Sequence, residues 1–156
     1  LNLDLTQFED QNEYRHYEFV LSNMKTSSDG AQLEMWSTLD KSTWNQVEWK
    51  LAGYKQVDGI TLTGFSDKGT NVKLAYAGNG STEYGYNGRF RINNFHSFHG
   101  PASIEGSIGA QDRSGNWGSS NWTGGITSPL NLKGIRLKCN IGYLNSGHVS
   151  IYGIRA

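Results

Sequence analysis

The sequence has little of several features that would point to particular classes of protein. Cys139 is the only cysteine among 156 residues, so an internal disulfide framework is excluded. No apolar run approaches the ~18 residues that a membrane-spanning helix needs, so membrane insertion is not expected. Basic and acidic residues number 14 each, and this zero net charge argues against a nucleic-acid partner, because such proteins normally carry a basic surplus.

The start of the chain does not have the pattern of a targeting signal. Residues Leu1–Asp10 are polar and acidic, so we expect no signal peptide. The first residue is Leu rather than Met, which indicates a processed protein or a fragment of a longer one. A lone cysteine fits synthesis in a reducing cytosol, even for a protein that later acts outside the cell.

Motifs for catalysis and cofactor binding are also missing. No G-x-S-x-G nucleophile elbow occurs, and no Lys-Ser/Thr phosphate loop follows the glycine-rich stretches. The acidic residues are scattered, so no pair suited to glycoside hydrolysis can be recognised. His96 and His99 have H-x-x-H spacing, but Gly100 and Pro101 follow at once, which indicates two ordinary loop histidines. We therefore predict no enzymatic activity, no metal site and no cofactor.

The chain is rich in alternation between apolar and polar residues. In residues 46–51, Val47, Trp49 and Leu51 alternate with polar neighbours, as in a strand with one face in water. Similar patterns recur along the chain and predict nine or ten strands, separated by turns that 20 glycines and many Ser, Asn and Thr residues favour. The one helical turn we expect is Asp40–Trp44, with Asp40 as its N-cap.

These patterns predict an all-β fold, an antiparallel β-sandwich of jelly-roll type with less than ~15% helix. We expect one domain over residues 14–156, preceded by an N-terminal arm or linker at residues 1–13. The side chains predicted to be buried are Leu21, Leu33, Val47, Trp49, Leu62, Leu74, Phe90, Ile104, Ile135, Leu137 and Ile151. Ser146-Gly147 is expected to form a turn before the last strand.

Candidate binding residues lie in the Gly/Ser-rich stretch Asp112–Gly125, which we interpret as a long loop. It carries Trp117 and Trp122, each directly after an asparagine, Asn116 and Asn121. Aromatic rings can stack on sugar C–H groups while amides bond to hydroxyls, so these four residues are candidates for binding a glycan or a partner protein. The alternative is that both indoles pack on their own sandwich or on a neighbouring subunit.

Blocks at the two ends of the chain resemble a known family. They are Tyr14–Asn23, Gln32–Ser37 and Asp40 near the start, and Gly134–Leu137 and Asn145–Ile154 at the end. In order and spacing these blocks resemble a β-sandwich family of tailed bacteriophages, whose members close with a strand reading S-G-x-h-x-h-Y-G-h, where h is hydrophobic. Members often have a Gly-Gly turn after the position of Asp40, whereas this chain has Lys and Ser there.

The resemblance implies a virion structural protein, made in the cytoplasm of the host bacterium and exposed on the particle. It implies a tail fibre, spike or receptor-binding domain that contacts the host surface or a host glycan, or alternatively a capsid decoration protein that contacts other virion proteins. A homotrimer is expected by the same resemblance. From the residues themselves a third possibility remains, a carbohydrate-binding, lectin-like module.

Overall fold

All regular structure in the described part of the chain is β-strand, as the alternating pattern predicts. The structure, a computed structural model, describes residues 1–4, 14–28, 30–56, 60–79, 85–97, 100–111 and 115–155. Over these residues there is no helix with the length and apolar character needed to cross a membrane.

Ten of the described strands are at least six residues long. They are β2 (His16–Thr26), β3 (Ala31–Thr38), β4 (Trp49–Gln56), β5 (Leu62–Gly69), β6 (Asn71–Asn79), β7 (Tyr86–Asn93), β9 (Ser103–Gln111), β10 (Trp117–Gly125), β12 (Gly134–Cys139) and β13 (Leu144–Ile154). Three are shorter: β1 (Asn2–Asp4), β8 (His96–Ser97) and β11 (Leu130–Asn131).

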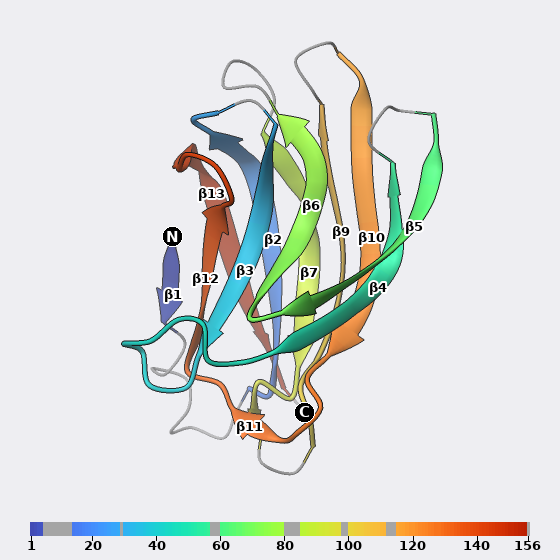
Figure 1. Cartoon of the computed structure of the whole chain (residues 1–156). Helices are drawn as coiled ribbons and strands as arrows, with labels where there is room; N and C mark the ends of the chain where they lie inside the picture. The colour runs from blue at the N-terminus through green and yellow to red at the C-terminus, as the bar shows by residue number, and fades with distance from the viewer. Residues whose placement is uncertain are drawn as a thin grey trace.

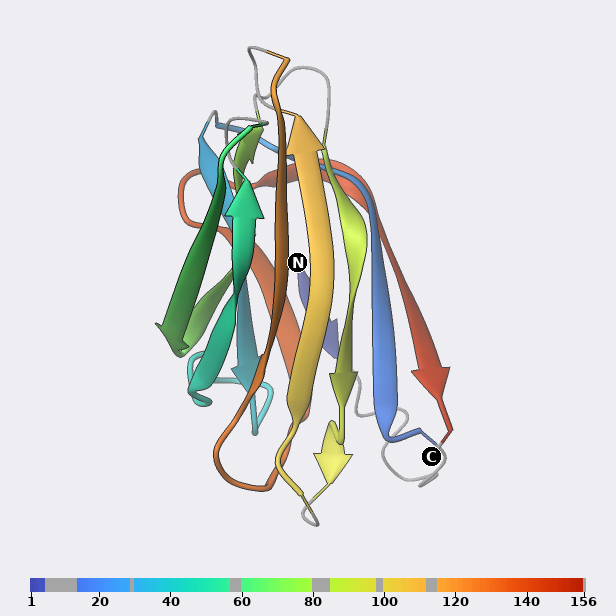
Figure 2. The same ribbon diagram turned by 90° about the vertical axis from the view of Figure 1, so that its right-hand side faces the viewer.

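Two larger sheets form the layers of a sandwich (Figure 1). One has seven strands in the order β13-β2-β7-β9-β10-β4-β5, and the other has four in the order β1-β12-β3-β6. Figure 2 looks onto the seven-stranded sheet, with β5 at the left and β13 at the right. Strands β8 and β11 form a separate two-stranded sheet. The predicted antiparallel sandwich is confirmed, while jelly-roll connectivity stays a prediction.

The first residues of the chain take part in the smaller sheet. Strand β1 pairs with β12, and the Leu1 amino group donates a hydrogen bond to the Leu137 carbonyl at 2.8 Å. Part of the segment predicted as an arm or linker thus adds an edge strand to the sandwich. Residues 5–13 of that segment lie outside the described residues.

The core lies between the two larger sheets, where the inward-facing side chains meet. Of the eleven side chains predicted to be buried, nine are at most 2% exposed. Ile151 is half-buried at the margin of the core. The prediction for Leu62 is wrong, since it is 65% exposed. Leu62 pairs with Gln56 on β4, which places it on the outer face of the sheet, while Phe65 of the same strand packs against the core.

The prediction that residues 112–125 form a long loop is also wrong for most of the segment. Trp117–Gly125 is β10, a central strand between β9 and β4, and residues 112–114 lie outside the described residues. Its small residues fit close neighbours: a Cβ on Gly124 would lie 2.0 Å from the Lys50 carbonyl oxygen. Glycine inside a strand marks such close backbone approach. The Gly/Ser-rich composition, which is typical of a loop, is therefore needed here for close packing against the neighbouring strands.

The expected turn at Ser146-Gly147 is instead a bulge inside β13. The register with β2 shifts on both sides of Ser146, and Gly147 has a φ of 126°. A Cβ on Gly147 would lie 2.6 Å from Met24 Cα, so only glycine fits this bulge.

Asp40 caps a tight turn, as predicted, but no helix follows it. Its carboxylate accepts hydrogen bonds from the backbone N–H groups of Thr43 and Ser42, both at 2.8 Å, and from the Gln46 side chain at 2.8 Å. These bonds hold the pKa of Asp40 far below its usual value of 3.8. The next residue, Lys41, has a φ of 68°, a left-handed conformation that glycine adopts more easily.

This turn should make stability depend on pH in the acidic range. Because folding lowers the pKa of Asp40, its ionised form stabilises the native state above about pH 4, and this contribution is lost as pH falls. We expect Asp40→Asn to be less stable than the wild type near pH 7, with the difference shrinking as pH is lowered from about 5 toward 2. Urea unfolding of both proteins across this range measures the difference. A constant difference would contradict the proposed role of the charge.

Candidate functional site

The four residues predicted to bind a partner or glycan separate into two groups in the structure. Trp122 is only 4% exposed, and its indole N–H donates a hydrogen bond to the Leu74 carbonyl of the facing sheet at 2.8 Å. The proposal that its ring contacts a partner is therefore corrected, since the ring belongs to the core. Asn116, Trp117 and Asn121 are exposed.

Trp117 and Asn121 lie on the same outer face of β10, because positions two apart in a strand share a face. Trp117 is 59% exposed and pairs with Gln111 at the start of the strand. Asn121 lies four residues further on, or about 13 Å along the strand. Of these two residues, only Asn121 lines the two surface depressions on this face of the sheet.

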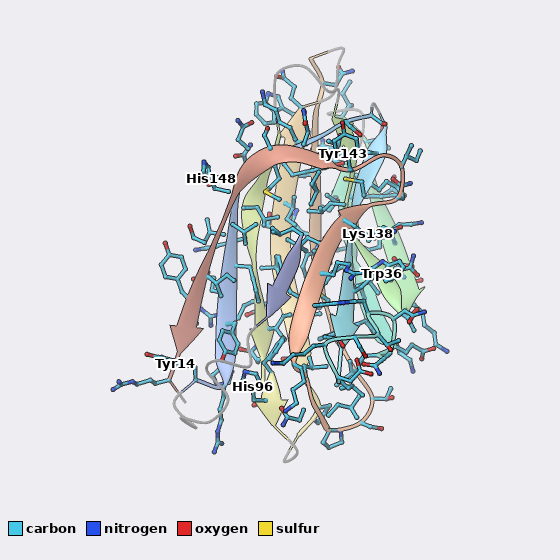
Figure 3. All side chains as sticks on the ribbon, turned by 90° about the vertical axis from the view of Figure 1, so that its left-hand side faces the viewer. Tyr14, Trp36, His96, Lys138, Tyr143 and His148 are labelled. Atoms are coloured by element: carbon cyan, nitrogen blue, oxygen red, sulfur yellow. The ribbon has the colours of Figure 1, made fainter. Side chains whose placement is uncertain are left out.

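His96 has a structural role. Its Nδ1–H donates to the Leu132 carbonyl at 2.9 Å, and in the neutral ring Nε2 accepts from the Tyr17 hydroxyl at 3.0 Å. The two ring nitrogens thus join the backbone at Leu132 to the side chain of Tyr17. His96 lies toward the lower end of the sandwich in Figure 3. His99 lies outside the described residues. Throughout the described ranges, no group of three or more His, Cys, Asp or Glu side chains could hold a metal ion.

The outer face of the seven-stranded sheet carries two neighbouring rows of side chains. Cross-strand register aligns them strand by strand from β13 to β5. The first row is Tyr152, Glu18, Arg91, Glu105, Thr123, Ala52 and Ser66, and the second is Ser150, Val20, Arg89, Ser107, Asn121, Tyr54 and Gly64. The Cβ atoms of directly paired residues on one face lie about 5 Å apart, so each row places side chains of neighbouring strands next to one another.

A groove of ≈ 440 Å³ lies over the middle of these rows, and we call it the central groove. Long charged side chains form its sides, Glu18 and Arg91 in the first row and Arg89 in the second, while Ser107 and Thr123 are short. Arg89 Nη1 lies 3.8 Å from Glu18 Oε1, and the two side chains are 75% and 25% exposed. A pair this exposed adds little stability, so its charges remain accessible to a ligand.

A second depression of ≈ 550 Å³ continues from the central groove over β4 and β5, and we call it the aromatic end. Asn121 and Thr123 line both depressions. Ala52 and Gly64 leave space beside Tyr54, which is 59% exposed. Tyr54 was missed by the sequence reasoning, although a signal existed: it is a large aromatic residue on the polar face of a strand that alternates.

The floor beneath the central groove is closely packed. Phe90 and Trp122 pack directly below it, with ring centroids 6.1 Å apart. Gly106 lies between them, and a Cβ there would be 2.6 Å from Phe90 Cβ and 2.7 Å from Trp122 Cη2. Trp122 therefore supports the site from inside the sandwich, and such backing fixes the side chains above it.

The outer face of the smaller sheet has its aromatic residues covered by cations. Lys138 Nζ lies 4.5 Å from the centre of the Trp36 ring (Figure 3). Arg136 Cζ lies 4.6 Å from the centre of the Trp44 ring. Each of these cation–π contacts covers one face of its ring. Cys139, at the end of β12, is 2% exposed, and burial raises the pKa of its thiol to about 11, so it is not a reactive nucleophile.

The geometry thus singles out the outer face of the seven-stranded sheet as the candidate binding site. In comparisons with known proteins, no protein-family model, no curated protein and no solved structure matches the chain.

Proposed function

We propose that this chain is a structural domain of a bacteriophage virion, displayed in a tail fibre or spike as a receptor-binding domain. The observation that carries this proposal is that the sequence blocks resembling the phage family meet in space. The opening blocks form β2 and β3, and the closing blocks form β13 and β12. Strand β13 pairs with β2, and β12 pairs with β3.

Contacts between single residues of these blocks support the same proposal. The ring of Tyr14, from the opening block, lies against Gly153 of the closing strand, where a Cβ would be 2.7 Å from Tyr14 Cδ1. The tyrosine ring of one motif thus occupies the space that a side chain at the glycine of the other motif would need. Lys41 has the left-handed φ of 68° at the position where the family often has glycine, which fits a shared turn geometry.

The proposed role is non-enzymatic and needs no cofactor. The sandwich would present an outer face to the host cell. In a trimer, three identical copies would bind at once, so contacts that are weak singly would together give firm attachment. Capsid decoration is the alternative within the same family, and there the partner would be another virion protein.

The test is to locate the chain on particles of the phage that encodes it. Antibodies against the purified chain should label the tail in electron micrographs, and the purified chain should compete with particles for adsorption to host cells. Label on the head with no competition would favour capsid decoration instead. Absence of the chain from purified particles would refute the proposal.

The expected trimer can be measured independently. Light scattering of the purified chain at micromolar concentration should give three times the mass of 17.3 kDa. A monomeric mass in solution, together with a single copy per site on the particle, would contradict trimer formation.

A further inference from the structure

We infer that the central groove and the aromatic end together bind a neutral oligosaccharide. This inference rests on the proposed function in taking the host surface as the source of the glycan.

The charges of the central groove cancel. Arg89 and Arg91 contribute two guanidinium groups, and Glu18 and Glu105 contribute two carboxylates. Glu18, Arg91 and Glu105 alternate in sign along the first row, and Arg89 of the second row lies 3.8 Å from Glu18. A polyanion would gain from the arginines but would meet a carboxylate beside each of them. A cationic ligand would meet the opposite conflict. The groove is therefore complementary to a ligand without net charge that can both donate and accept hydrogen bonds.

Sugar hydroxyls have that property. A hydroxyl can donate to a carboxylate such as Glu105 and accept from a guanidinium such as Arg91, and hydrogen bonds to charged groups are the stronger ones. The Asn121 amide, between the two depressions, offers a donor and an acceptor at once. A dry protein interface is a poorer fit, because burying four charged side chains carries a desolvation cost that a long ion pair such as Arg89–Glu18 does not repay.

The aromatic end supplies the apolar part of sugar recognition. Tyr54 pairs directly with Asn121 across β10 and β4, so a ring face and an amide lie side by side. Gly64, opposite Tyr54 on β5, has no side chain to cover that ring. The C–H face of a pyranose can therefore stack on Tyr54 while its hydroxyls reach Asn121.

The dimensions favour a chain of several sugars over a single one. The depressions extend across six neighbouring strands, from β2 to β5, which at ~4.8 Å per strand is about 24 Å. We expect the oligosaccharide to cross the strands from Glu18 on β2 at one end to Tyr54 on β4 and Gly64 on β5 at the other.

The experiment is calorimetric titration of the purified chain with neutral hexasaccharides of glucose, mannose, galactose and N-acetylglucosamine, and with heparin as a polyanionic probe. At least one neutral hexasaccharide should bind, and its affinity should change little with salt because no net charge is neutralised. Binding of heparin alone, or of none of the hexasaccharides at millimolar concentration, would overturn the inference.

Three variants assign the binding to this face. Tyr54→Ala and Asn121→Ala should each weaken binding of the hexasaccharide at least about tenfold, while Tyr54→Phe, which keeps the ring, should bind nearly as the wild type does. Tyr143→Ala is the matched control, since Tyr143 is 65% exposed but lies outside both depressions. All four substitutions are at exposed residues, and thermal unfolding verifies that each variant folds. Unchanged affinity in both Tyr54→Ala and Asn121→Ala would refute this site.

The failure of this inference can be told apart from failure of the proposed function. Particles that carry the chain, combined with no glycan binding, would refute the glycan groove alone. Binding of a hexasaccharide by a chain that is absent from particles would refute the virion role alone.

Discussion

Replacing Trp122 with alanine should lower the free energy of unfolding by about 3–5 kcal/mol, the usual cost of deleting a buried tryptophan ring. The ring is 4% exposed and packs beside Phe90 under the central groove. Its loss would leave a cavity and would also leave the Leu74 carbonyl without the indole N–H that now donates to it at 2.8 Å.

Trp117→Ala is the matched control for this prediction. Trp117 is on the same strand but is 59% exposed, so its removal should change stability by less than about 0.5 kcal/mol. Urea unfolding, followed by circular dichroism, measures both variants. Similar stability of the two would show that the Trp122 ring is not part of the core.

Replacing Trp49 with alanine should also lower the free energy of unfolding by about 3–5 kcal/mol, through the loss of a different set of contacts. Trp49 is fully buried, and its indole N–H donates to the Ser37 hydroxyl at 2.8 Å, which joins β4 of the larger sheet to β3 of the smaller one. The alanine variant loses the packing of the ring and leaves the Ser37 hydroxyl buried without this partner.

Ser37→Ala separates these two contributions. It removes only the acceptor, so it should cost about 1–3 kcal/mol, the penalty for a buried donor without a partner. In the double variant Trp49→Ala/Ser37→Ala the effects should not add, because both substitutions remove the same hydrogen bond. Additive costs would contradict a direct contribution from this bond.

Alternation along single strands was enough to predict the sandwich and most of its core. It failed where a strand contains few large apolar residues: β10 presents Gly118, Ser120 and Gly124 inward, so its role depends on neighbouring strands that fill the space. It failed at Leu62 for a related reason, because the phase of β5 relative to the core is set by pairing with β4.

The candidate site was predictable only in part. Asn121 was identified from its place near tryptophans, but Tyr54, Arg89 and Glu105 were not, because nothing local connects them. They come from β4, β7 and β9, and only the register of those strands with β10 brings them into neighbouring rows. Register between distant segments is a tertiary property, which a single sequence does not display.

The bulge at Gly147 affects how readily copies of the protein can associate edge to edge through β13. Among the described strands, β13 lies at the edge of the larger sheet, and an edge strand is a template on which another chain can add by hydrogen bonding. The two register shifts around Ser146 bend this edge strand and interrupt the regular spacing of backbone N–H and C=O groups that such addition requires. Copies held close together at high local concentration would therefore resist merging into a continuous intermolecular sheet.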